Sequence, residues 1–421
     1  MNSNLYNLFQ ECHHVVCTDT RKIIPNSLFF ALKGENFNGN QFATAALESG
    51  AKYAVIDEEE YLIDEKTILV SDVLKSLQSL ANEYRLTLNI PIIGITGSNG
   101  KTTSKELIGR VLSRKYRVHV TPGNFNNHIG LPLTILSAPP NSEMLLLEMG
   151  DNHPGEINHL CEIADPTHGL ITNVGKDHIE GFGSFEANRL AKKELFDYLN
   201  AHGGICFVPK FESDVVKMVP PRAKKISLGN ELKPELSNPF VRYSNASKKI
   251  ITTHFIGDYN FKNIEMAYSI GKHFKVDEQL IHEAIASYTP QNNRSQFIET
   301  KTNSIFLDAY NANPSSVDLA LQSFAKQKLK VHRIAILGDM LELGNVSNEE
   351  HERIIEQVNQ TSITPYFVGK EYGKLAHPKK GKFFLDRFEL IEFLKNSPIT
   401  NSQVLIKGSR GIRLEEVLAY L

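Results

Sequence analysis

The sequence predicts an α/β protein of three domains. The chain has 421 residues, which is enough for about three domains. Short continuous apolar runs alternate with helical patterns, as in parallel sheets that helices cover on both faces. One of these runs leads through a glycine-rich loop into a helical pattern. We expect a small α/β domain at residues 1–85, a central P-loop domain with a parallel sheet at residues 86–290, and a Rossmann-like C-terminal domain at residues 291–421.

The composition indicates a cytoplasmic protein without nucleic-acid or membrane partners. The net charge is −2, so no strongly basic surface is expected. The N-terminus is polar and acidic, unlike a signal peptide, and no apolar stretch approaches the roughly 20 residues that cross a bilayer. The cysteines show neither a disulfide framework nor zinc spacing, which fits a reducing compartment: Cys12, Cys17, Cys161 and Cys206.

The first domain is predicted from three apolar runs and one helical stripe. The runs span residues 28–32, 53–56 and 67–70, and polar turns separate them. The stripe recurs every three or four residues and gives one apolar helix face: Val73, Leu74, Leu77, Ala81 and Tyr84. These patterns indicate a small sheet with a helix packed against it.

A phosphate-binding loop opens the central domain. Residues 94–103 read Gly-Ile-Thr-Gly-Ser-Asn-Gly-Lys-Thr-Thr and follow the apolar run at residues 90–93. Backbone N–H groups of such a loop bind phosphate oxygens, Lys101 would reach the β- and γ-phosphates, and the Thr102 hydroxyl would hold Mg²⁺. The loop enters the positive end of a helix, which also favours anions. The predicted nucleotide-binding residues of the loop are Gly97, Ser98, Asn99, Gly100, Lys101, Thr102 and Thr103.

The loop departs from the general pattern at one position. Ile95 stands where glycine is usual, and the additional glycine is Gly97. The alternative interpretation is an ordinary glycine-rich turn between a strand and a helix. The apolar strand before Gly-Lys-Thr-Thr and the helical stripe after it favour a phosphate loop of a particular branch of nucleotide-binding proteins. The stripe consists of Leu107, Ile108, Val111 and Leu112.

The alternation continues through the rest of the central domain. Apolar runs at residues 144–147, 170–172 and 204–208 predict strands, and residues 186–199 predict a helix. Residues 209–250 are rich in Lys, Pro, Ser and Asn, so we expect small strands and turns at the edge of this domain.

A second doubly wound sheet is predicted for the C-terminal domain. Helical patterns at residues 316–326 and 349–360 lie between apolar runs. The expected strands are residues 304–307, 333–337, 365–368, 382–385 and 404–406.

Polar side chains follow several predicted strands, where ligands of open parallel sheets bind. Glu148 shares a domain with Thr102, so we predict it as a Mg²⁺ ligand; a solvated glutamate is the alternative. His178 follows the next strand and could be a metal ligand, a base or a core histidine. Asp308 and Asp339 each end a strand of the C-terminal domain. Together these groups indicate a site at the facing edges of two sheets.

Three loop regions could contact a polar substrate. Asn124, Asn126 and Asn127 lie in a glycine-flanked stretch and could either form turns or hydrogen-bond a ligand. Residues 309–314 and 407–411 follow strands of the C-terminal domain. They would face a cleft between domains.

These segments together resemble the Mur ligase family across nearly the whole chain. Residues 96–103 have that family's variant of the phosphate loop, including the missing first glycine. The ending at residues 407–410 agrees, and the Asp-Asn-Pro-Arg motif of the branch that adds the third amino acid is not found. The stretches most similar to the branch that adds D-alanyl-D-alanine are residues 123–132, 147–157 and 308–314.

The resemblance implies two Mg²⁺ sites in the central domain. Thr102 and Glu148 would bind the first ion, and His178 the second. Lys192 falls where the family carries a lysine carbamate, which turns a cation into a carboxylate-like ligand and requires a neutral amine. Lys193 is the neighbouring alternative, and two lysines on a solvated helix face are the simpler interpretation. The implied catalytic residues are Lys101, His178 and Lys192.

The resemblance implies that ATP lies between the central and C-terminal domains. Asn260 and Asn263 match the family's adenine-side asparagines, and Tyr259 stands where the family often has histidine. Arg294 and Asp308 would reach ATP from the C-terminal domain.

The other implied residues would contact the two remaining substrates. Thr20, Arg21 and Lys33 belong to the part that resembles a UDP-sugar site, and Ser409 and Arg410 lie where the incoming amine is expected. The complete implied substrate set is Thr20, Arg21, Lys33, Asn124, Asn126, Asn127, Asn311, Asn313, Ser409 and Arg410.

The implied activity is ATP- and Mg²⁺-dependent amide ligation in peptidoglycan precursor synthesis, by a chain that acts as a monomer. The implied partners are a UDP-N-acetylmuramoyl tripeptide and D-alanyl-D-alanine. A related ligase with another acceptor, such as a folate-polyglutamate enzyme, is one alternative, and the Asn-rich residues 124–127 argue against it. A nucleotide-gated binding protein without chemistry is the other. The presence of every implied metal and catalytic residue argues against that alternative.

Overall fold

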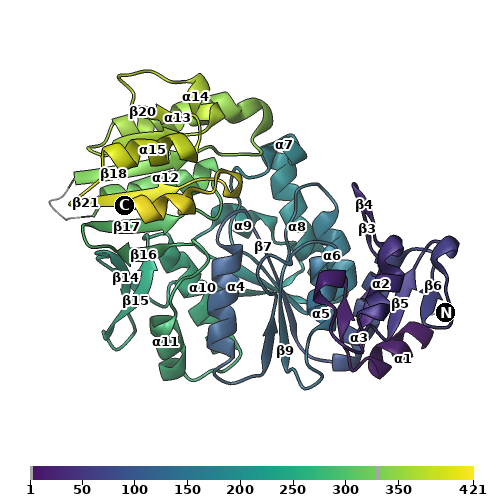
Figure 1. Ribbon diagram of the computed structural model, residues 1–421. Coiled ribbons are helices and arrows are strands. Elements are labelled where there is room, and N and C mark those ends of the chain that lie inside the picture. Colours follow the sequence, from purple (N-terminus) through teal and green to yellow (C-terminus); the bar gives the residue numbers. More distant parts are fainter. Residues whose placement is uncertain (1–2, 328–331) are drawn as a thin grey trace.

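The computed structural model describes residues 3–327 and 332–421 and shows three α/β domains that follow one another along the chain (Figure 1). The N-terminal domain contains β1 to β6, the central domain β7 to β15 and the C-terminal domain β16 to β21. In Figure 1 the central domain lies in the middle, with the N-terminal domain on its right and the C-terminal domain above it. The predicted fold class is therefore confirmed.

The N-terminal domain is a parallel sheet with the strand order β1-β2-β5-β6. Its strands are β1 (Val16–Cys17), β2 (Leu28–Phe30), β5 (Tyr53–Ile56) and β6 (Thr67–Leu69), with a hairpin of β3 (Lys33–Gly34) and β4 (Phe37–Asn38). Its helices are α1 (Ser3–Glu11), α2 (Ala43–Glu48) and α3 (Val73–Leu88), and its 3₁₀ helices are η1 (Thr20–Lys22), η2 (Gly39–Phe42) and η3 (Glu59–Tyr61). Strands lie in all three predicted apolar runs, and the closing helix is confirmed.

Helix α3 joins the N-terminal domain to the central domain. The Asp72 carboxylate accepts the Lys75 N–H at 2.9 Å, which satisfies a backbone donor that the first helical turn leaves free. Near the other end, the Tyr84 hydroxyl donates to the Ala138 carbonyl of the central domain at 2.7 Å. The buried face of α3 also contacts α5 and α6. These two domains therefore share one hydrophobic core.

The central domain has a parallel sheet with the strand order β12-β11-β10-β7-β9-β8. The strands are β7 (Ile92–Thr96), β8 (Val118–Val120), β9 (Met144–Glu148), β10 (His168–Ile171), β11 (Ile205–Pro209) and β12 (Lys224–Leu228). β7 and β9 are buried along their whole length. Both faces of the sheet are covered by other elements, which explains why these strands read as continuous apolar runs.

Helices pack on both faces of the central sheet. They are α4 (Lys101–Leu112), α5 (Gly130–Leu136), α6 (Glu156–Ala164), α7 (Ile179–Phe182), α8 (Phe185–His202), α9 (Ser213–Met218), α10 (Asn260–His273) and α11 (Glu278–Ser287). α8 confirms the helix predicted at residues 186–199, and the predicted apolar stripe of α4 is buried. Across residues 3–327 and 332–421, no helix is both long and apolar enough to cross a bilayer.

Residues 209–250 hold more structure than the small strands and turns that were predicted. β12 extends the parallel sheet, and β13 (Lys233–Glu235), β14 (Phe240–Ser244) and β15 (Ile250–Ile256) form a separate antiparallel sheet. Helix α9 was not expected. It buries Val215 and Met218, which are three residues apart and so lie on one helix face.

The C-terminal domain has the strand order β16-β17-β21-β18-β19-β20, parallel except for the edge strand β16. The strands are β16 (Gln296–Glu299), β17 (Asn303–Asp308), β18 (His332–Gly338), β19 (Thr364–Val368), β20 (Lys382–Phe384) and β21 (Ser402–Lys407). The helices are α12 (Pro314–Ala325), α13 (Ser347–Asn359), α14 (Lys370–Lys374) and α15 (Arg387–Asn396), with 3₁₀ helices η4 (Gly344–Val346), η5 (Arg410–Ile412) and η6 (Leu414–Tyr420). The strands predicted for this domain are confirmed, and only β16 was not foreseen.

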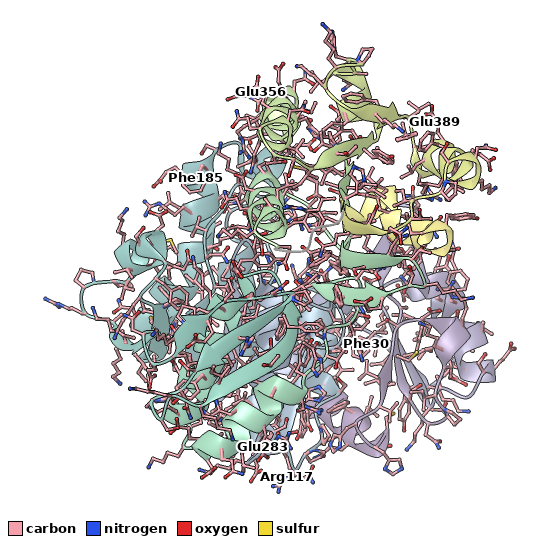
Figure 2. The ribbon with its side chains drawn as sticks, turned by 90° about the vertical axis from the view of Figure 1, so that its left-hand side faces the viewer. Phe30, Arg117, Phe185, Glu283, Glu356 and Glu389 are labelled. Carbon is pink, nitrogen blue, oxygen red and sulfur yellow. The ribbon has the colours of Figure 1, made fainter. Side chains whose placement is uncertain are left out.

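The C-terminal domain lies across the carboxyl ends of the central strands. In Figure 2, Arg117, which directly precedes β8, lies at the lower end of the central domain, and Glu356 of α13 lies at the top of the molecule. The loop after β10 contacts α13 directly, because Lys176 Nζ lies 2.6 Å from Glu350 Oε1. This arrangement brings together the carboxyl ends of the strands of two sheets, which is where ligands of parallel sheets bind.

Candidate active site

The predicted phosphate loop connects β7 to α4 in a conformation that requires glycine. Gly97 has φ +137°, and a Cβ atom there would lie 2.2 Å from Thr172 Oγ1. Gly100 has φ +77° and caps α4. The Asn99 N–H donates to Asn173 Oδ1 at 2.9 Å, which holds the loop against the end of β10. The Lys101 ammonium folds back and donates to the Gly97 carbonyl.

A cavity of about 1000 Å³ lies between the central and C-terminal domains, next to this loop. Most of the predicted site residues line it: Ser98, Asn99, Gly100, Lys101, Thr102, Thr103, Asn124, Asn126, Asn127, Glu148, His178, Asn260, Asn263, Arg294, Asp308, Asn311 and Asn313. The remaining predicted residues do not line it: Gly97, Lys192, Thr20, Arg21, Lys33, Ser409 and Arg410. The structure thus brings together residues from position 98 to position 313 of the chain.

Glu148 ends β9 beside the start of α4. Its Oε1 accepts the Thr102 hydroxyl at 3.2 Å and the Asn126 amide at 2.9 Å, and its backbone N–H donates to Thr121 Oγ1 at 2.9 Å. Its Oε2 has no hydrogen-bond partner within the part of the chain that the structure describes, and it faces Lys105 Nζ at 3.5 Å. The side chain is 2 % exposed. A buried carboxylate oxygen without a hydrogen bond is costly, so this atom is available for a cation.

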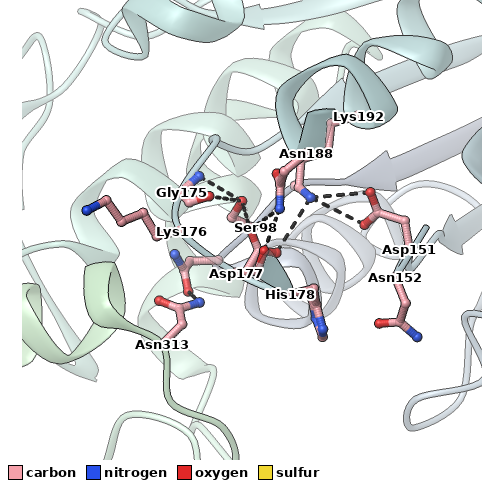
Figure 3. Close-up of polar contacts among 12 residues, drawn as sticks. Ser98, Asp151, Asn152, Gly175, Lys176, Asp177, His178, Asn188, Lys192 and Asn313 are labelled. Atoms are coloured by element: carbon pink, nitrogen blue, oxygen red, sulfur yellow. Dashed lines mark hydrogen bonds and ion pairs between the residues drawn. The ribbon is translucent and has the colours of Figure 1, made fainter. Parts of the chain in front are cut away.

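A second carboxylate cluster surrounds Lys192 of α8 (Figure 3). Lys192 is fully buried, and its Nζ lies 3.3 Å from Asp151 Oδ2 and 3.5 Å from Asp177 Oδ2. Asp177 Oδ1 accepts hydrogen bonds from the Ser98 hydroxyl of the phosphate loop and, at 3.0 Å, from the Asn188 amide. Burial opposes ionisation of Asp177, but the charges of Lys192 and Lys101 outweigh it and hold the pKa of this carboxyl below its usual value.

The two adjacent lysines of α8 lie in different surroundings. Lys193 is 28 % exposed and pairs with Asp197 one turn further along the helix. Only Lys192 contacts the acidic pair of Asp151 and Asp177. Of the two lysines that the sequence left open, Lys192 is therefore the one beside the cavity.

His178 lies at the contact between domains. It directly precedes α7 with φ +49°, and its Nδ1 lies 2.5 Å from Glu342 Oε2 of the C-terminal domain. The hydrogen bond from His178 lowers the pKa of Glu342. His178 therefore lines the cavity while it is engaged with a carboxylate across the domain boundary.

The two predicted asparagines of α10 form a buried polar network. The Asn260 amide donates to Ile256 O at 2.8 Å and to Ser295 Oγ at 2.9 Å, and the Asn263 amide donates to Asn260 Oδ1 at 2.8 Å. The Ser104 hydroxyl of α4 donates to Asn263 Oδ1 at 3.1 Å. This network connects the phosphate-loop helix to the C-terminal domain.

Tyr259 is part of the same connection. Its hydroxyl lies 3.4 Å from Ser295 Oγ and donates to Asp308 Oδ2 at 3.5 Å. Burial, together with the Asp308 charge, raises the pKa of Tyr259 well above its usual value. Tyr259 is therefore a neutral hydrogen-bond donor at neutral pH.

Asp308 ends β17 and forms an ion pair with Lys407, the last residue of the neighbouring strand β21. Lys407 Nζ lies 2.7 Å from Asp308 Oδ2 and donates to the Asn311 carbonyl at 3.3 Å. Arg294 lies with its guanidinium 3.5 Å from the centre of the Tyr310 ring. All of these groups border the cavity, so the C-terminal side of the cavity carries positive charge.

The predicted asparagines differ in how their side chains are engaged. Asn127 Oδ1 accepts the N–H groups of Ile129 and Gly130 at 3.2 and 2.8 Å at the start of α5. Asn311 Oδ1 accepts the N–H of Ala312 at 2.9 Å. Asn124 is exposed toward the cavity. These side chains thus combine turn formation with access to the cavity, the two roles that the sequence left open.

Asn313 connects the C-terminal domain to the phosphate loop. Its Oδ1 accepts the Ser316 N–H at 2.9 Å and caps α12 in a capping box. Its amide donates to Asn99 Oδ1 at 2.9 Å. Both ends of the side chain are engaged by protein, and it is 7 % exposed.

The predicted residues of the N-terminal domain lie outside the cavity and form charged pairs. Arg21 Nη2 lies 2.8 Å from Asp19 Oδ2, and this contact lowers the pKa of Asp19 to about 2. Lys33 Nζ lies 2.9 Å from Asp57 Oδ1 and 2.7 Å from Glu58 Oε1. Thr20 lies beside Arg21 in η1.

Ser409 and Arg410 lie behind the C-terminal wall of the cavity. The Ser409 hydroxyl accepts the Leu341 N–H at 2.9 Å and donates to the Ala312 carbonyl at 3.3 Å. The Arg410 guanidinium lies 4.9 Å from the Tyr310 ring centre, so Tyr310 contacts both Arg410 and Arg294. Arg410 thus contacts a residue that lines the cavity, whereas Leu341 and Ala312, the contacts of Ser409, do not line it.

Sequence reasoning missed three charged residues of the site. Asp151 and Asp177 follow β9 and β10 closely, so the rule about strand ends could have found them. Lys105 lies on α4 one turn after Lys101 and is fully buried. A lysine on a helix is usually solvated, so the sequence carried no signal for its burial.

The oxygen donors at the phosphate loop fit a magnesium ion. Among the described residues, no three Asp, Glu, His or Cys side chains converge on one point. Magnesium is nevertheless commonly bound by one or two carboxylates, with phosphate oxygens and water completing the coordination. Glu148 Oε2, which accepts no hydrogen bond from the described residues, and the Thr102 hydroxyl next to a phosphate loop meet that requirement.

A phosphate loop at a parallel-sheet edge, closed by a second doubly wound domain, defines a nucleotide-binding α/β protein. Family models match three consecutive parts: the Mur ligase family catalytic domain at residues 13–94, the Mur ligase middle domain at residues 95–271, and the Mur ligase glutamate ligase domain at residues 293–410. The chain belongs to the Mur ligase family. The resemblance that the sequence predicted is thereby confirmed.

Relatives and solved structures match along the whole chain. A Bacillus subtilis protein named UDP-N-acetylmuramoyl-tripeptide–D-alanyl-D-alanine ligase is 34% identical over 425 residues, covering 96% of this chain and 92% of the relative. A crystal structure of MurF from Acinetobacter baumannii matches with a TM-score of 0.86 at 26% identity, covering 98% of this chain and 97% of that one. MurF ligase from Thermotoga maritima in complex with ADP matches with a TM-score of 0.82 at 26% identity, covering 96% of both chains.

Proposed function

We propose that this chain is an ATP-dependent amide ligase that joins D-alanyl-D-alanine to a UDP-N-acetylmuramoyl tripeptide, with ADP and phosphate as the other products. Full-length relatives carry the name of this enzyme. The observation that carries the proposal is the cavity in which the phosphate loop of the central domain faces Asp308 and Lys407 of the C-terminal domain. Such a cavity can hold a nucleotide and the group that receives its phosphoryl group.

ATP binds with its phosphates on the loop at residues 97–103. The loop amides and the N-terminus of α4 attract the phosphate oxygens. Lys101 exchanges its contact with the Gly97 carbonyl for the transferring phosphoryl group. Asn260 and Asn263 form the adenine side, and Arg294 and Asp308 complete the site from the C-terminal domain.

Thr102 and Glu148 would hold a magnesium ion, and His178 would hold a second one. When bound, the metal offsets negative charge on the phosphoryl group that is transferred. His178 can serve as a ligand through its Nε2 while its Nδ1 stays on Glu342 Oε2, because a metal-bound histidine commonly donates its other ring N–H to a carboxylate.

A carboxylate does not react with an amine at neutral pH, so ATP must first activate it. The terminal carboxylate of the tripeptide attacks the γ-phosphorus and becomes an acyl phosphate, while ADP leaves. The amine of D-alanyl-D-alanine then attacks the acyl carbon, and the tetrahedral intermediate expels phosphate. Lys101 stabilises charge on the transferring group. The docked C-terminal domain excludes water, which would otherwise hydrolyse the acyl phosphate.

Lys192 is our choice for the carbamate that the family resemblance implies. Conversion of its ammonium into a carbamate replaces a positive charge with a negative one beside Asp151 and Asp177. The modified side chain therefore needs a cation in the site. We expect Lys192→Ala to lose activity that bicarbonate does not restore, and full activity in that variant would refute the assignment.

The three domains divide the substrates among them. We assign the UDP end to residues 1–85, with Thr20, Arg21 and Lys33, ATP to residues 86–290, and the amine to residues 291–421. Arg410 acts on the amine through Tyr310, which lines the cavity, and Ser409 holds the backbone of Ala312, next to the lining residues Asn311 and Asn313. The enzyme acts as a monomer in the cytoplasm, where ATP is available, and sedimentation of the purified chain tests its oligomeric state.

Phosphate release tests the proposed reaction. We expect release that requires ATP, a UDP-N-acetylmuramoyl tripeptide and D-alanyl-D-alanine together, with the pentapeptide product detected by mass. Release with glutamate or lysine in place of D-alanyl-D-alanine would instead identify a ligase with another acceptor. ATP binding without release under any pairing would identify a binding protein without chemistry.

A further inference from the structure

A buried lysine next to the metal-binding carboxylate has no role in the reaction described above. Lys105 lies on α4 and is fully buried. Its Nζ donates to the carbonyls of Thr121 at 2.7 Å and Gly123 at 3.2 Å. It also lies 3.2 Å from Glu106 Oε1 and 3.5 Å from Glu148 Oε2. A lysine is almost never fully buried unless its charge is paired, so these contacts account for its position.

Lys105 is the cation that faces the free oxygen of Glu148. Glu148 Oε1 is engaged by Thr102 and Asn126 at 3.2 and 2.9 Å. Within residues 3–327 and 332–421, Oε2 accepts no hydrogen bond, and Lys105 is the charged group beside it. The carboxylate is thus balanced by protein charge on the side away from the cavity.

Lys105 is distinct from the lysine that serves the phosphates. Lys101, one helical turn earlier, lines the cavity, whereas Lys105 does not. The two carbonyls at residues 121 and 123 hold the Lys105 ammonium in place. The same contacts fix the backbone that leads to Asn126, which is itself bound to Glu148.

We propose that Lys105 is a positioning residue that supplies a counter-charge to Glu148. It holds this buried carboxylate in its orientation before Mg²⁺ arrives. Because like charges repel, the same ammonium weakens the attraction of the site for the metal. Lys105 therefore sets the Mg²⁺ concentration at which the site fills. The inference rests on the proposed function, because it takes Glu148 as a metal ligand.

The test is thermal unfolding of the full chain with ADP over a range of Mg²⁺ concentrations. In Lys105→Met we expect a lower Tm without Mg²⁺, because the Glu148 charge is left without its partner. We expect Mg²⁺ to raise the Tm of this variant more than that of the unaltered protein. The Mg²⁺ concentration for half of the effect should fall about tenfold.

Two other substitutions serve as controls. Lys105→Arg keeps the charge and should restore the Mg²⁺ response of the unaltered protein. Lys115 also donates to two backbone carbonyls, those of Phe274 at 3.3 Å and Lys275 at 2.8 Å, and it does not line the cavity. Lys115→Met should therefore leave the Mg²⁺ response unchanged.

Each outcome bears on a different part of the proposal. An equal loss of Tm with and without Mg²⁺ in Lys105→Met, at an unchanged half-saturating concentration, overturns the role of Lys105 and leaves the metal site intact. No Mg²⁺ response in the unaltered protein overturns the metal site itself. If Lys105→Met does not fold, Lys105→Met combined with Glu148→Gln should fold, because both charges are removed together. A double variant that also fails to fold overturns the charge pairing.

Discussion

The carboxyl ends of the central and C-terminal sheets meet at the cavity, and the carboxylates at these two edges differ in their hydrogen bonding. At the central edge, Glu148 Oε2 and Asp177 Oδ2 are buried and accept no hydrogen bond from the described residues. At the C-terminal edge, Asp308 receives the Ser295 N–H at 3.1 Å and Lys407 Nζ at 2.7 Å on separate oxygens. Both edges follow the same rule of polar residues at strand ends. The two oxygens at the central edge face a lysine ammonium at 3.5 Å but accept no hydrogen bond from the described residues, whereas both oxygens of Asp308 do.

Both carboxylate oxygens of Asp339 accept hydrogen bonds, as those of Asp308 do. Its Oδ2 accepts the Glu371 N–H at 2.9 Å and its Oδ1 accepts the Tyr372 N–H at 3.0 Å, at the start of α14. A buried carboxylate that is satisfied by protein groups holds structure in place, whereas an unsatisfied one is costly unless a ligand completes it. This difference supports the proposal that the central edge binds the cation while the C-terminal edge holds structure in place.

The largest expected effect is the loss of activity in Glu148→Gln. The substitution removes the charge that would hold Mg²⁺ while it keeps the size of the side chain. We expect kcat to fall about 100- to 1000-fold, since the metal supplies several kcal/mol of charge stabilisation. Phosphate release at saturating substrates measures the effect.

The matched control for this prediction lies at the other end of the same strand. Glu143 directly precedes β9 and pairs with Arg117 at 3.3 Å on the surface. Glu143→Gln should keep its activity within about twofold. If Glu148→Gln is as active as Glu143→Gln, the central edge does not bind the metal through Glu148.

The second effect concerns stability at the C-terminal edge. Asp308→Asn leaves Lys407, which is 2 % exposed, without its ion-pair partner. We expect the free energy of unfolding to fall by about 2–3 kcal/mol, measured by urea denaturation. Lys407→Met in the same chain should recover most of this loss, because the unpaired buried charge is removed. Losses that simply add would show that the pair does not hold this edge together.

The sequence could predict features that lie within one short segment or at the carboxyl end of a strand. The phosphate loop was found because its glycines, Lys101 and Thr102 lie within one short segment, and Glu148 and Asp308 were found because each ends a strand. The Asp308–Lys407 pair joins residues 99 positions apart. Such a pairing depends on the strand order, in which β21 lies beside β17, and no local pattern specifies that order.

Other parts of the site depend on burial that the sequence does not encode locally. Lys105 and Lys192 both lie on helices where lysine usually faces water, and both are fully buried. Asn313 was predicted to contact a substrate by resemblance, and its side chain is engaged with Ser316 and Asn99. Whether it also reaches a substrate stays a prediction. The Asn313–Asn99 contact forms only when the C-terminal domain docks on the central domain, whereas Lys105 and Lys192 are surrounded by distant segments of the central domain itself.

A smaller effect is expected at Asn313, where two substitutions separate its contact with Asn99 of the central domain from its capping of α12. Asn313→Ser keeps a hydroxyl that can cap α12 but is too short to reach Asn99, so it loses the contact between domains. We expect kcat/KM to fall about fivefold, which is the value of one hydrogen bond of about 1 kcal/mol, at nearly unchanged stability. Asn313→Ala should show the same kinetic loss and an additional loss of about 1 kcal/mol in unfolding free energy. Equal kinetics in Asn313→Ser and the unaltered protein would remove Asn313 from domain positioning.

The smallest expected effect is on the acid side of the stability profile. With Lys192 unmodified, as in this structure, the charges of Lys192 and Lys101 outweigh the burial of Asp177 and keep its pKa below the usual value. A carboxyl whose pKa is lower in the folded state stabilises the fold above its unfolded pKa of about 3.9, and this contribution is lost as the pH falls through the folded pKa. Asp177→Asn should therefore be less stable than the unaltered protein at neutral pH and lose less stability on acidification.

Urea denaturation between about pH 6 and about pH 3 measures the difference. The control is Asp214→Asn, because Asp214 forms an exposed pair with Lys217. Parallel profiles for Asp177→Asn and Asp214→Asn would show that the central edge is no more strongly charged than the surface.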